Sequence, residues 1–208
     1  MLLWKKNYNF DPTTIDMIVS QLRENEKSLD SDLNYHTSYF FNDEDKPELV
    51  FMNQYREICD QISKDMGLYH RAGLSFDIWM QVYTNQSKTF NRHEHFSGNE
   101  FLSWVHFLRQ PEEQNFYFLN SEGEKIYPEV KQGDLIVFPS WVLHAAAPPK
   151  SEGDRVIISG NIQVEVLLRD RSNTEVSKLM YHRFGGRFGM WEVCQEKLPM
   201  EEYYEAES

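Results

Sequence analysis

The hydrophobic pattern of the chain changes its period near residue 73, and this change constrains the fold more than any other feature. Before this point, apolar residues recur every three or four positions, as they do along one face of an α-helix. After it, they alternate with polar residues, as they do in half-buried β-strands. The sequence therefore predicts a helical first third of the chain and a remainder that consists mainly of strands.

Two amphipathic helices are expected in the first third. Asp11 is a suitable N-cap for a helix that begins at Pro12, because proline is favoured at the first helical position. The apolar face of this helix would comprise Ile15, Ile18, Val19 and Leu22. A second helix is expected to begin near Pro47 and to end at Gly67, a residue type that favours helix C-termini.

Short strands separated by turn signals follow. The segment LSFDIWMQVYT alternates, so that one of its faces carries Trp79, Gln81 and Tyr83, while the other carries Ile78, Met80 and Val82. Further strands are expected in FLSWVHFLRQP, NFYFLN, KIYPEV, GDLIVFPSWVLHAA and DRVIISGNIQVEVLL. This order predicts a mainly β protein with some α-helix, in which a double-stranded β-helix (a cupin-like jelly roll) carries packing helices from its N-terminal section.

The domain organisation expected from this pattern is a single domain over residues 1–208. It would consist of a helical section at about 1–72, a jelly-roll core at about 73–168 and a C-terminal extension at about 169–208. The extension contains a Gly- and Arg-rich segment at 183–189, which is expected to form a loop.

Composition excludes several classes of protein. The formal net charge of −12 disfavours a nucleic-acid partner, because a surface that follows phosphates needs clustered Lys and Arg. No apolar run approaches the roughly 18 residues of a membrane span, and the N-terminus lacks the pattern of a signal peptide. With only two cysteines, Cys59 and Cys194, we expect neither a disulfide framework nor a thiolate zinc site.

Three histidines are candidates for a metal site. His93 and His95 are two residues apart on an expected strand and therefore share one of its faces, whereas Glu94 points to the opposite face. His144 ends the apolar segment LIVFPSWVLH. Three ligands from two strands would leave coordination positions open for substrate and oxygen, and imidazole suits iron, zinc, copper or nickel. The alternative is that these are exposed strand histidines without a ligand.

Arg155 follows His144 on the next expected strand. A guanidinium that pointed into the same barrel would bind a carboxylate through two parallel hydrogen bonds. The alternative is an ion pair with one of the nearby acidic residues at the surface.

Several of these motifs occur together in a known family. The chain carries WMQVY, HEH, LSWVHFL, GDLIVFPSWVLH and DRVIISGNI in this order. The span from Trp79 to Val164 thereby resembles the iron(II)- and 2-oxoglutarate-dependent oxygenases of phages and marine bacteria, which are prolyl 4-hydroxylase-like. The segment GDLIVFPSWVLHAAAPP is the most specific part of this resemblance.

The resemblance implies a set of cofactors and site residues. The cofactors are Fe(II), 2-oxoglutarate as cosubstrate, and O2. The implied iron ligands are His93, His95 and His144. Arg155 would bind the distal carboxylate of 2-oxoglutarate, and the implied further contacts to the cosubstrate are Gln81, Tyr83 and His106.

One position departs from the family pattern. The usual motif of these oxygenases is H-x-D/E, and in this chain His95 stands where the carboxylate is expected. Either the site uses three histidines, or a bulge in the strand turns Glu94 inward. A set of three neutral ligands would leave more positive charge on the metal than a set that contains a carboxylate.

The resulting hypothesis is a dioxygenase that hydroxylates a small molecule or a protein side chain. One alternative is a cupin-like three-histidine metalloenzyme that does not use 2-oxoglutarate, and another is a jelly roll that only binds a partner. We expect a cytoplasmic protein of the producing or infected cell, with no membrane partner. The sequence leaves the primary substrate open and is compatible with a homodimer.

Overall fold

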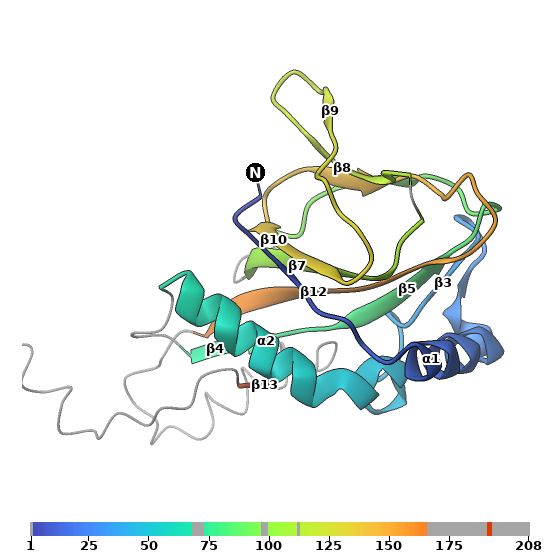
Figure 1. Ribbon diagram of the computed structural model, residues 1–208, viewed down its shortest axis with the longest axis horizontal. Coiled ribbons are helices and arrows are strands. Elements are labelled where there is room, and N and C mark those ends of the chain that lie inside the picture. The colour runs from blue at the N-terminus through green and yellow to red at the C-terminus, as the bar shows by residue number, and fades with distance from the viewer. Residues whose placement is uncertain (1, 68–72, 97–99, 112, 166–190, 193–208) are drawn as a thin grey trace, which may run out of the picture.

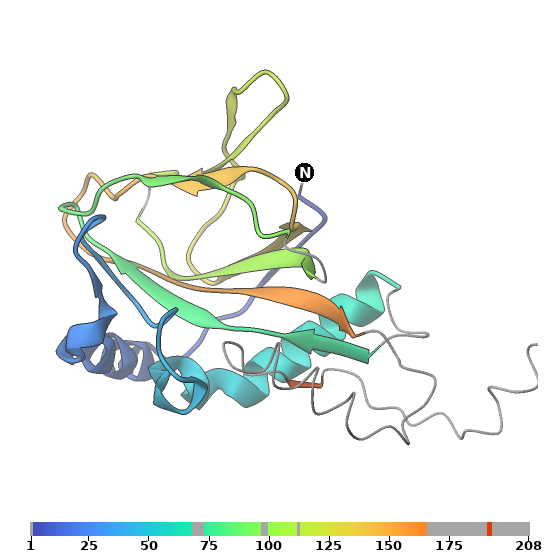
Figure 2. The same ribbon diagram turned by 180° about the vertical axis from the view of Figure 1, so that it is seen from behind.

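The computed structural model describes residues 2–67, 73–96, 100–111, 113–165 and 191–192. Two antiparallel β-sheets lie face to face, and helices cover the outer face of the larger sheet (Figures 1 and 2). This is the jelly roll with packing helices that the change of period predicts. No helix within these residues has both the length and the apolar character that a membrane crossing needs.

The larger sheet is built from strands of both halves of the chain. Its strands are Trp4–Asn7 (β1), Leu29–Asp30 (β2), Tyr35–Thr37 (β3), Gly73–Phe76 (β4), Trp79–Tyr83 (β5), Glu100–Arg109 (β7), Asp134–Pro139 (β10), Arg155–Glu165 (β12) and Trp191–Glu192 (β13). They are ordered β1-β10-β7-β12-β5-β3-β2, with β4 beside β12 and β13 beside β4.

The smaller sheet has the order β6-β11-β8-β9. Its strands are Phe90–His93 (β6), Phe116–Leu119 (β8), Lys125–Ile126 (β9) and His144–Ala146 (β11). The β8–β9 hairpin projects away from the body of the protein (Figure 1). Strands β6 and β11 lie side by side and carry candidate metal ligands.

The helices begin as the sequence predicts, with one difference. The α-helices are Pro12–Glu24 (α1) and Met52–Asp65 (α2), and the 3-10 helices are Glu26–Ser28 (η1), Asp43–Asp45 (η2) and Pro47–Phe51 (η3). The carboxylate of Asp11 caps α1 by accepting a hydrogen bond from the Thr14 backbone N–H at 2.8 Å. The second helix starts at Pro47 as a 3-10 turn and becomes α-helical only at Met52.

Two apolar cores hold these layers together. The outer core packs the helices against the larger sheet, and its central members are Ile18, Leu22, Tyr55, Ile62, Met80, Val82 and Trp104. The inner core fills the space between the sheets with Tyr83, Val105, Phe107, Phe116, Phe118, Phe138 and Ile157. Each fully buried side chain of this size contributes about 1.5–3 kcal/mol through burial, so apolar packing dominates the stability of the fold.

The alternation expected along β5 is confirmed. Ile78, Met80 and Val82 belong to the outer core beneath the helices. The residues between them, which include Gln81 and Tyr83, face the space between the two sheets.

Two expectations about the elements are wrong. The N-terminal section is not only helical, because it also supplies β1, β2 and β3, and β1 pairs with β10 along the edge of the larger sheet. The single strand expected in LSFDIWMQVYT is broken at Asp77 and Ile78 into β4 and β5. At this break Asp77 hydrogen-bonds Asn161 of β12, which interrupts the regular ladder.

Other expectations fall partly outside the described residues. These are the C-terminal extension, apart from β13, and the Gly- and Arg-rich segment 183–189. Cys194 also lies outside them, whereas Cys59 is a buried free thiol.

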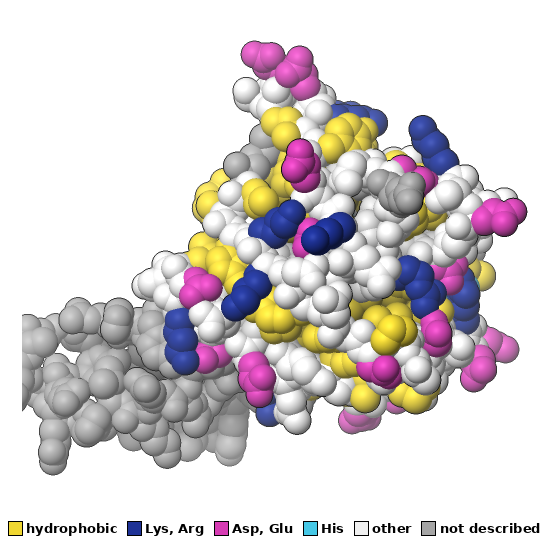
Figure 3. Space-filling view, viewed as in Figure 1, with side chains coloured by type: hydrophobic (Ala, Val, Ile, Leu, Met, Phe, Trp, Pro, Cys, Tyr) yellow, Lys and Arg dark blue, Asp and Glu magenta, His cyan; other side chains and the backbone are white. Residues whose placement is uncertain are grey.

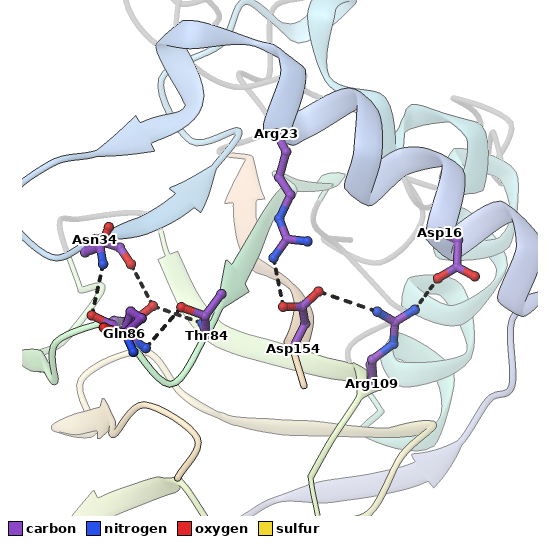
Figure 4. Close-up of polar contacts among 8 residues, drawn as sticks. Asp16, Arg23, Asn34, Thr84, Gln86, Arg109 and Asp154 are labelled. Carbon is purple, nitrogen blue, oxygen red and sulfur yellow. Dashed lines mark hydrogen bonds and ion pairs between the residues drawn. The ribbon is translucent and has the colours of Figure 1, made fainter. Parts of the chain in front are cut away.

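Polar contacts fasten α1 to the rim of the barrel (Figure 4). Arg23 of α1 donates to Asp154 at 2.8 Å, Asp154 also lies 3.8 Å from Arg109 at the end of β7, and Arg109 in turn pairs with Asp16. Asn34 donates to the Gln86 carbonyl at 3.0 Å and thereby ties the turn after β2 to the turn after β5. Exposed pairs of this kind contribute less than about 1 kcal/mol each, so they orient α1 more than they stabilise the protein.

Charged side chains of both signs are interspersed over the face shown in Figure 3, with apolar side chains between them. The described residues of this face therefore present no continuous basic surface. That the protein has no nucleic-acid partner stays a prediction.

Candidate metal centre

The structure brings the three candidate histidines together. His93 ends β6 and is the cross-strand partner of His144, the first residue of β11. One potential ligand atom from each of His93, His95 and His144 lies within 4.8 Å of the other two. Within the described part of the chain, no other group of His, Cys, Asp or Glu comes together in this way. The pairing of β6 with β11 thus brings His144 to His93, while His95 follows just after β6.

Hydrogen bonds fix the proton position on two of the imidazoles. The Nδ1 atom of His95 lies 2.7 Å from Oδ1 of Asn161, and that of His144 lies 2.9 Å from the Val142 carbonyl oxygen. Both oxygens only accept hydrogen bonds, so each Nδ1 carries the proton. The lone pair is then on Nε2, which is the arrangement of a metal ligand whose other nitrogen is held by a second residue.

Burial keeps these imidazoles neutral. It lowers the pKa of His144 to about 2, and the neighbouring His93 and His95 lower it further. Burial also lowers the pKa of His95. The neutral form is the one that binds a metal ion.

Glu94 does not join the cluster. Its side chain is exposed and accepts a hydrogen bond from the backbone N–H of Phe96 at 2.5 Å. The register between β6 and β11 does shift, but the irregularity lies between the pairs His93–His144 and Phe90–Ala146, ahead of the histidine pair. Glu94 borders the cavity, but it is not a member of the cluster, which within the described residues contains three histidines and no carboxylate.

A cavity of about 500 Å³ opens beside the histidines. Its lining includes His93, His95, His144, Tyr35, Tyr39, Trp79, Gln81, Tyr83, Val105, Phe116, Ile157, Ser159 and Asn161. This volume is typical of a small-molecule site, and the mixture of apolar walls with a few polar groups is also typical.

Arg155 faces the same side of its strand as three cavity residues. It begins β12, and the residues at alternate positions along this strand, Ile157, Ser159 and Asn161, line the cavity. The guanidinium is only 1% exposed and lies 4.2 Å from the centroid of the Tyr83 ring. It points inward and is not part of a surface ion pair.

The guanidinium of Arg155 is only partly satisfied by the protein. Nη1 donates to the Ala147 carbonyl at 3.0 Å, whereas Nε and Nη2 have no hydrogen-bond partner. Burial lowers the pKa of Arg155, but its ordinary value is so high that the group stays charged. Buried donors without partners are costly, and two neighbouring guanidinium donors are the group that can bind a carboxylate bidentately; that Arg155 does so stays a prediction.

Two tyrosines support this arginine. The ring of Tyr83 stacks on that of Tyr35, with centroids 5.0 Å apart and an interplanar angle of 5°. Burial raises the pKa of Tyr83 to about 12 and also raises the pKa of Tyr35, so both hydroxyls stay protonated. Gln81 and Tyr83 lie in the cavity as expected; their contact with a cosubstrate stays a prediction.

The expectation for His106 is wrong. On β7, Val105 and Phe107 belong to the inner core, so His106 between them points to the helices. There it is fully buried, with Nδ1 2.8 Å from the Tyr55 hydroxyl and Nε2 3.0 Å from the Tyr8 carbonyl. Both nitrogens are used by the protein, and the ring does not line the cavity.

Sequence reasoning assigned no role to Tyr35, Asp77 or Asn161. Asn161 carried a usable signal, because it shares the strand face of Arg155 at even spacing. Asp77 interrupts an apolar strand pattern, which is also a signal for a special role. Tyr35 lies in the N-terminal section, and nothing in its local sequence indicates that β3 pairs with β5.

Comparisons with known proteins agree with this geometry. Residues 77–161 match the family model described as "Putative 2OG-Fe(II) oxygenase", and this span contains the three histidines and Arg155. No curated protein matches the chain in sequence.

Solved structures share the fold. The chain is similar to a prolyl-4-hydroxylase from Pseudomonas putida, with 15% identity, coverage of 77% of this chain and 91% of that chain, and a TM-score of 0.52. The corresponding values for the viral collagen prolyl hydroxylase of Paramecium bursaria Chlorella virus-1 are 15%, 78%, 97% and 0.51. For a 2OG-Fe(II) oxygenase family oxidoreductase from Burkholderia pseudomallei they are 12%, 76%, 82% and 0.55.

At these identities the structural likeness shows only the fold, a double-stranded β-helix. The indication of an activity comes from the family match over residues 77–161. That family implies an enzyme that uses Fe(II), 2-oxoglutarate and O2. Residues 77–161 thus match the 2OG-Fe(II) oxygenase family, as the resemblance in the sequence predicted, and the histidine cluster lies within this matched span.

Proposed function

We propose that the protein hydroxylates a small molecule or a peptide side chain, using Fe(II) held by His93, His95 and His144. The observation that supports this most is the presence in one barrel of two complementary features. One is a cluster of three histidines, and the other is a buried arginine with two unused donors. A metal ion and a carboxylate ligand together would satisfy both.

The residues present fit the implied cofactors. The cluster offers three imidazole nitrogens to a divalent metal, which leaves positions open for other ligands. Arg155 offers Nε and Nη2 to the distal carboxylate of 2-oxoglutarate. When bound, Fe(II) with O2 supplies the oxidation of a substrate C–H bond, coupled to decarboxylation of 2-oxoglutarate to succinate.

The protein's contribution is orientation and the exclusion of water. The Tyr83 ring covers one face of the Arg155 guanidinium and thereby holds the guanidinium plane in one orientation. Val105, Phe116 and Ile157 form an apolar wall of the cavity and lower the local dielectric, which strengthens the contact between arginine and carboxylate. Gln81 also lines this cavity and would donate its amide N–H to the cosubstrate.

An aromatic wall leads from the cluster towards the cavity opening. The Trp79 ring lies 5.6 Å from that of His95, and the Tyr39 ring meets Trp79 edge-on at 5.4 Å. Tyr39 is 43% exposed, whereas Trp79 is buried. We assign this wall to the primary substrate, because it borders the metal ligands and also reaches solvent.

The test is succinate formation. Full-length protein would be loaded with Fe(II) without oxygen, mixed with 2-oxoglutarate and exposed to air, with succinate measured over time. We expect slow turnover without a primary substrate, and its loss in His144→Ala but not in His36→Ala, which alters a histidine outside the cavity. If the iron-loaded protein neither binds 2-oxoglutarate nor forms succinate, the assignment fails, and a three-histidine metalloenzyme that does not use 2-oxoglutarate replaces it.

A further inference from the structure

A buried carboxylate stands behind the metal cluster. Asp77 is 1% exposed and lies at the break between β4 and β5. It accepts two hydrogen bonds from Asn161, one from the backbone N–H and one from Nδ2 at 3.1 Å. Its own backbone N–H donates to the Asn161 carbonyl at 3.2 Å. Three bonds therefore lock these two residues together, although they are far apart in sequence.

This clamp orients the Asn161 amide. With Nδ2 on the Asp77 carboxylate, Oδ1 points the other way and accepts from His95 Nδ1 at 2.7 Å and from Ser103 Oγ at 2.9 Å. The flipped amide would place its oxygen against the carboxylate, which is also an acceptor. It would also place its NH2 group against His95 Nδ1, which could then carry no proton. The carboxylate thus determines which amide atom faces the histidine.

The orientation of Asn161 in turn selects the His95 tautomer. Because Oδ1 only accepts, His95 must carry its proton on Nδ1, and Nε2 keeps the lone pair. A solvent-exposed neutral imidazole exchanges between the two tautomers, and only one of them directs Nε2 at a metal. His95 occupies the position at which related oxygenases carry an acidic ligand.

We propose that Asp77 and Asn161 are positioning residues of the metal centre, which hold His95 as the Nδ1–H tautomer and increase the basicity of its Nε2. This inference rests on the proposed metal ligation. The chain of carboxyl, amide and imidazole places Asp77 one residue behind the neutral ligand. Outer partners of this kind typically contribute 10- to 100-fold to metal affinity.

The first experiment needs no substitution. Long-range 1H–15N correlation spectra of the metal-free full-length protein distinguish Nδ1–H from Nε2–H histidines. We expect His95 to be the Nδ1–H tautomer, with its assignment confirmed by loss of the signal in His95→Gln. An Nε2–H signal for His95 in the wild-type protein would overturn the proposal.

The second experiment measures affinity for Co(II) by titration of its visible absorption. Asn161→Leu removes the acceptor, and we expect binding to weaken by about 10- to 100-fold with loss of the Nδ1–H signal. Asp77→Asn leaves all contacts to His95 in place but sets a second amide against Asn161, and we expect about a 10-fold loss. Unchanged affinity in both variants would contradict the proposal.

Two further variants separate positioning from stability. Asn161→Asp keeps an acceptor opposite His95, and the new carboxyl would share one proton with the Asp77 carboxyl. This variant should therefore retain most of the Co(II) affinity that Asn161→Leu loses. Thr37→Val removes a buried hydrogen bond to the Met80 carbonyl in the same sheet, without touching the cluster. It should lower the melting temperature and leave Co(II) affinity unchanged. Equal affinity losses in Thr37→Val and Asn161→Leu would show that the effect is merely structural.

These measurements are independent of the oxygenase activity. If Co(II) affinity and the tautomer respond as expected but no succinate forms, the positioning role stands and the proposed reaction fails. If succinate forms but Asn161→Leu keeps full Co(II) affinity, the proposed reaction stands and the positioning role fails.

Discussion

The two faces of the larger sheet both bury histidine, with different consequences. On the helix-covered face, His106 uses both ring nitrogens for protein hydrogen bonds, to Tyr55 and to Tyr8. On the barrel side, His95 and His144 use only Nδ1 in this way and direct Nε2 into a cluster. Burial is common to both faces, so burial does not identify a ligand. What distinguishes a ligand is a nitrogen that the protein leaves unused.

Arginine shows the same contrast. Arg109 at the rim is about one-third exposed and pairs with Asp16 and Asp154. Arg155 is buried, and two of its donor atoms have no partner. An unsatisfied charge inside the protein is costly to maintain, which is why it indicates a ligand site where an exposed ion pair does not.

The strongest test of this comparison removes a histidine from the barrel side. His144→Ala should weaken Co(II) or Fe(II) binding by more than about 100-fold, because outer partners alone contribute 10- to 100-fold. Isothermal titration and metal analysis after gel filtration measure this. Full metal occupancy in the variant would rule out His144 as a ligand.

The matching change on the helix side is His106→Phe. It leaves the Tyr55 hydroxyl and the Tyr8 carbonyl without their partner, so the free energy of unfolding should fall by about 2–4 kcal/mol. Urea denaturation measures the loss, and metal affinity should equal that of the wild type. A large loss of metal affinity in a folded His106→Phe protein would contradict the assignment of a purely structural role to His106.

The pH dependence of stability sharpens the same contrast. Burial lowers the pKa of His106 to about 4, below its value in the unfolded chain of about 6.5. Because the unfolded state then binds the proton more tightly, stability should decline by about 3 kcal/mol as pH falls from about 6.5 to about 4. Denaturation at several pH values in this range measures the free energy of unfolding. It should fall more with decreasing pH in the wild type than in His106→Phe. Identical pH profiles would contradict the neutral state of His106.

The paired arginines provide the next comparison. Arg155→Ala should raise the KM for 2-oxoglutarate by at least about 30-fold, since loss of one partner of a buried charge pair costs about 2–5 kcal/mol. Metal occupancy should stay near that of the wild type, and Arg155→Lys should restore activity only partly, because lysine lacks the fork. Arg109→Ala is the matched control at the rim and should leave this KM unchanged. An equal rise in both variants would remove the special role of Arg155.

The smallest expected effect is that of Glu94→Gln. The Glu94 carboxylate binds the Phe96 backbone N–H and lies outside the cluster, so metal affinity should change by less than about threefold. The same Co(II) titration measures it. A large loss would show that Glu94 reaches the metal and that the site includes a carboxylate.

The sequence by itself determined the local elements and the sets of residues that share a face. Helix α1 follows from the Asp11 cap, Pro12 and the apolar spacing, all of which act within a few residues. The strand period of two places Arg155 in line with Asn161, whatever the strand packs against. The expected strand through His93 and His95 is shorter in the structure, because β6 ends at His93. The order of the motifs adds the resemblance to the 2OG-Fe(II) oxygenases, which the family model matches over residues 77–161.

The tertiary structure decided which face of each strand becomes the interior of the barrel. Both faces of β7 are buried, one under helices and one under the smaller sheet, so alternation alone could not tell that His106 belongs to the helix side. Likewise, Tyr35 reaches Tyr83, and Asp77 reaches Asn161, only through strand pairings between distant segments. Such pairings depend on the packing of the whole chain, because no local energy term links residues that are far apart in sequence.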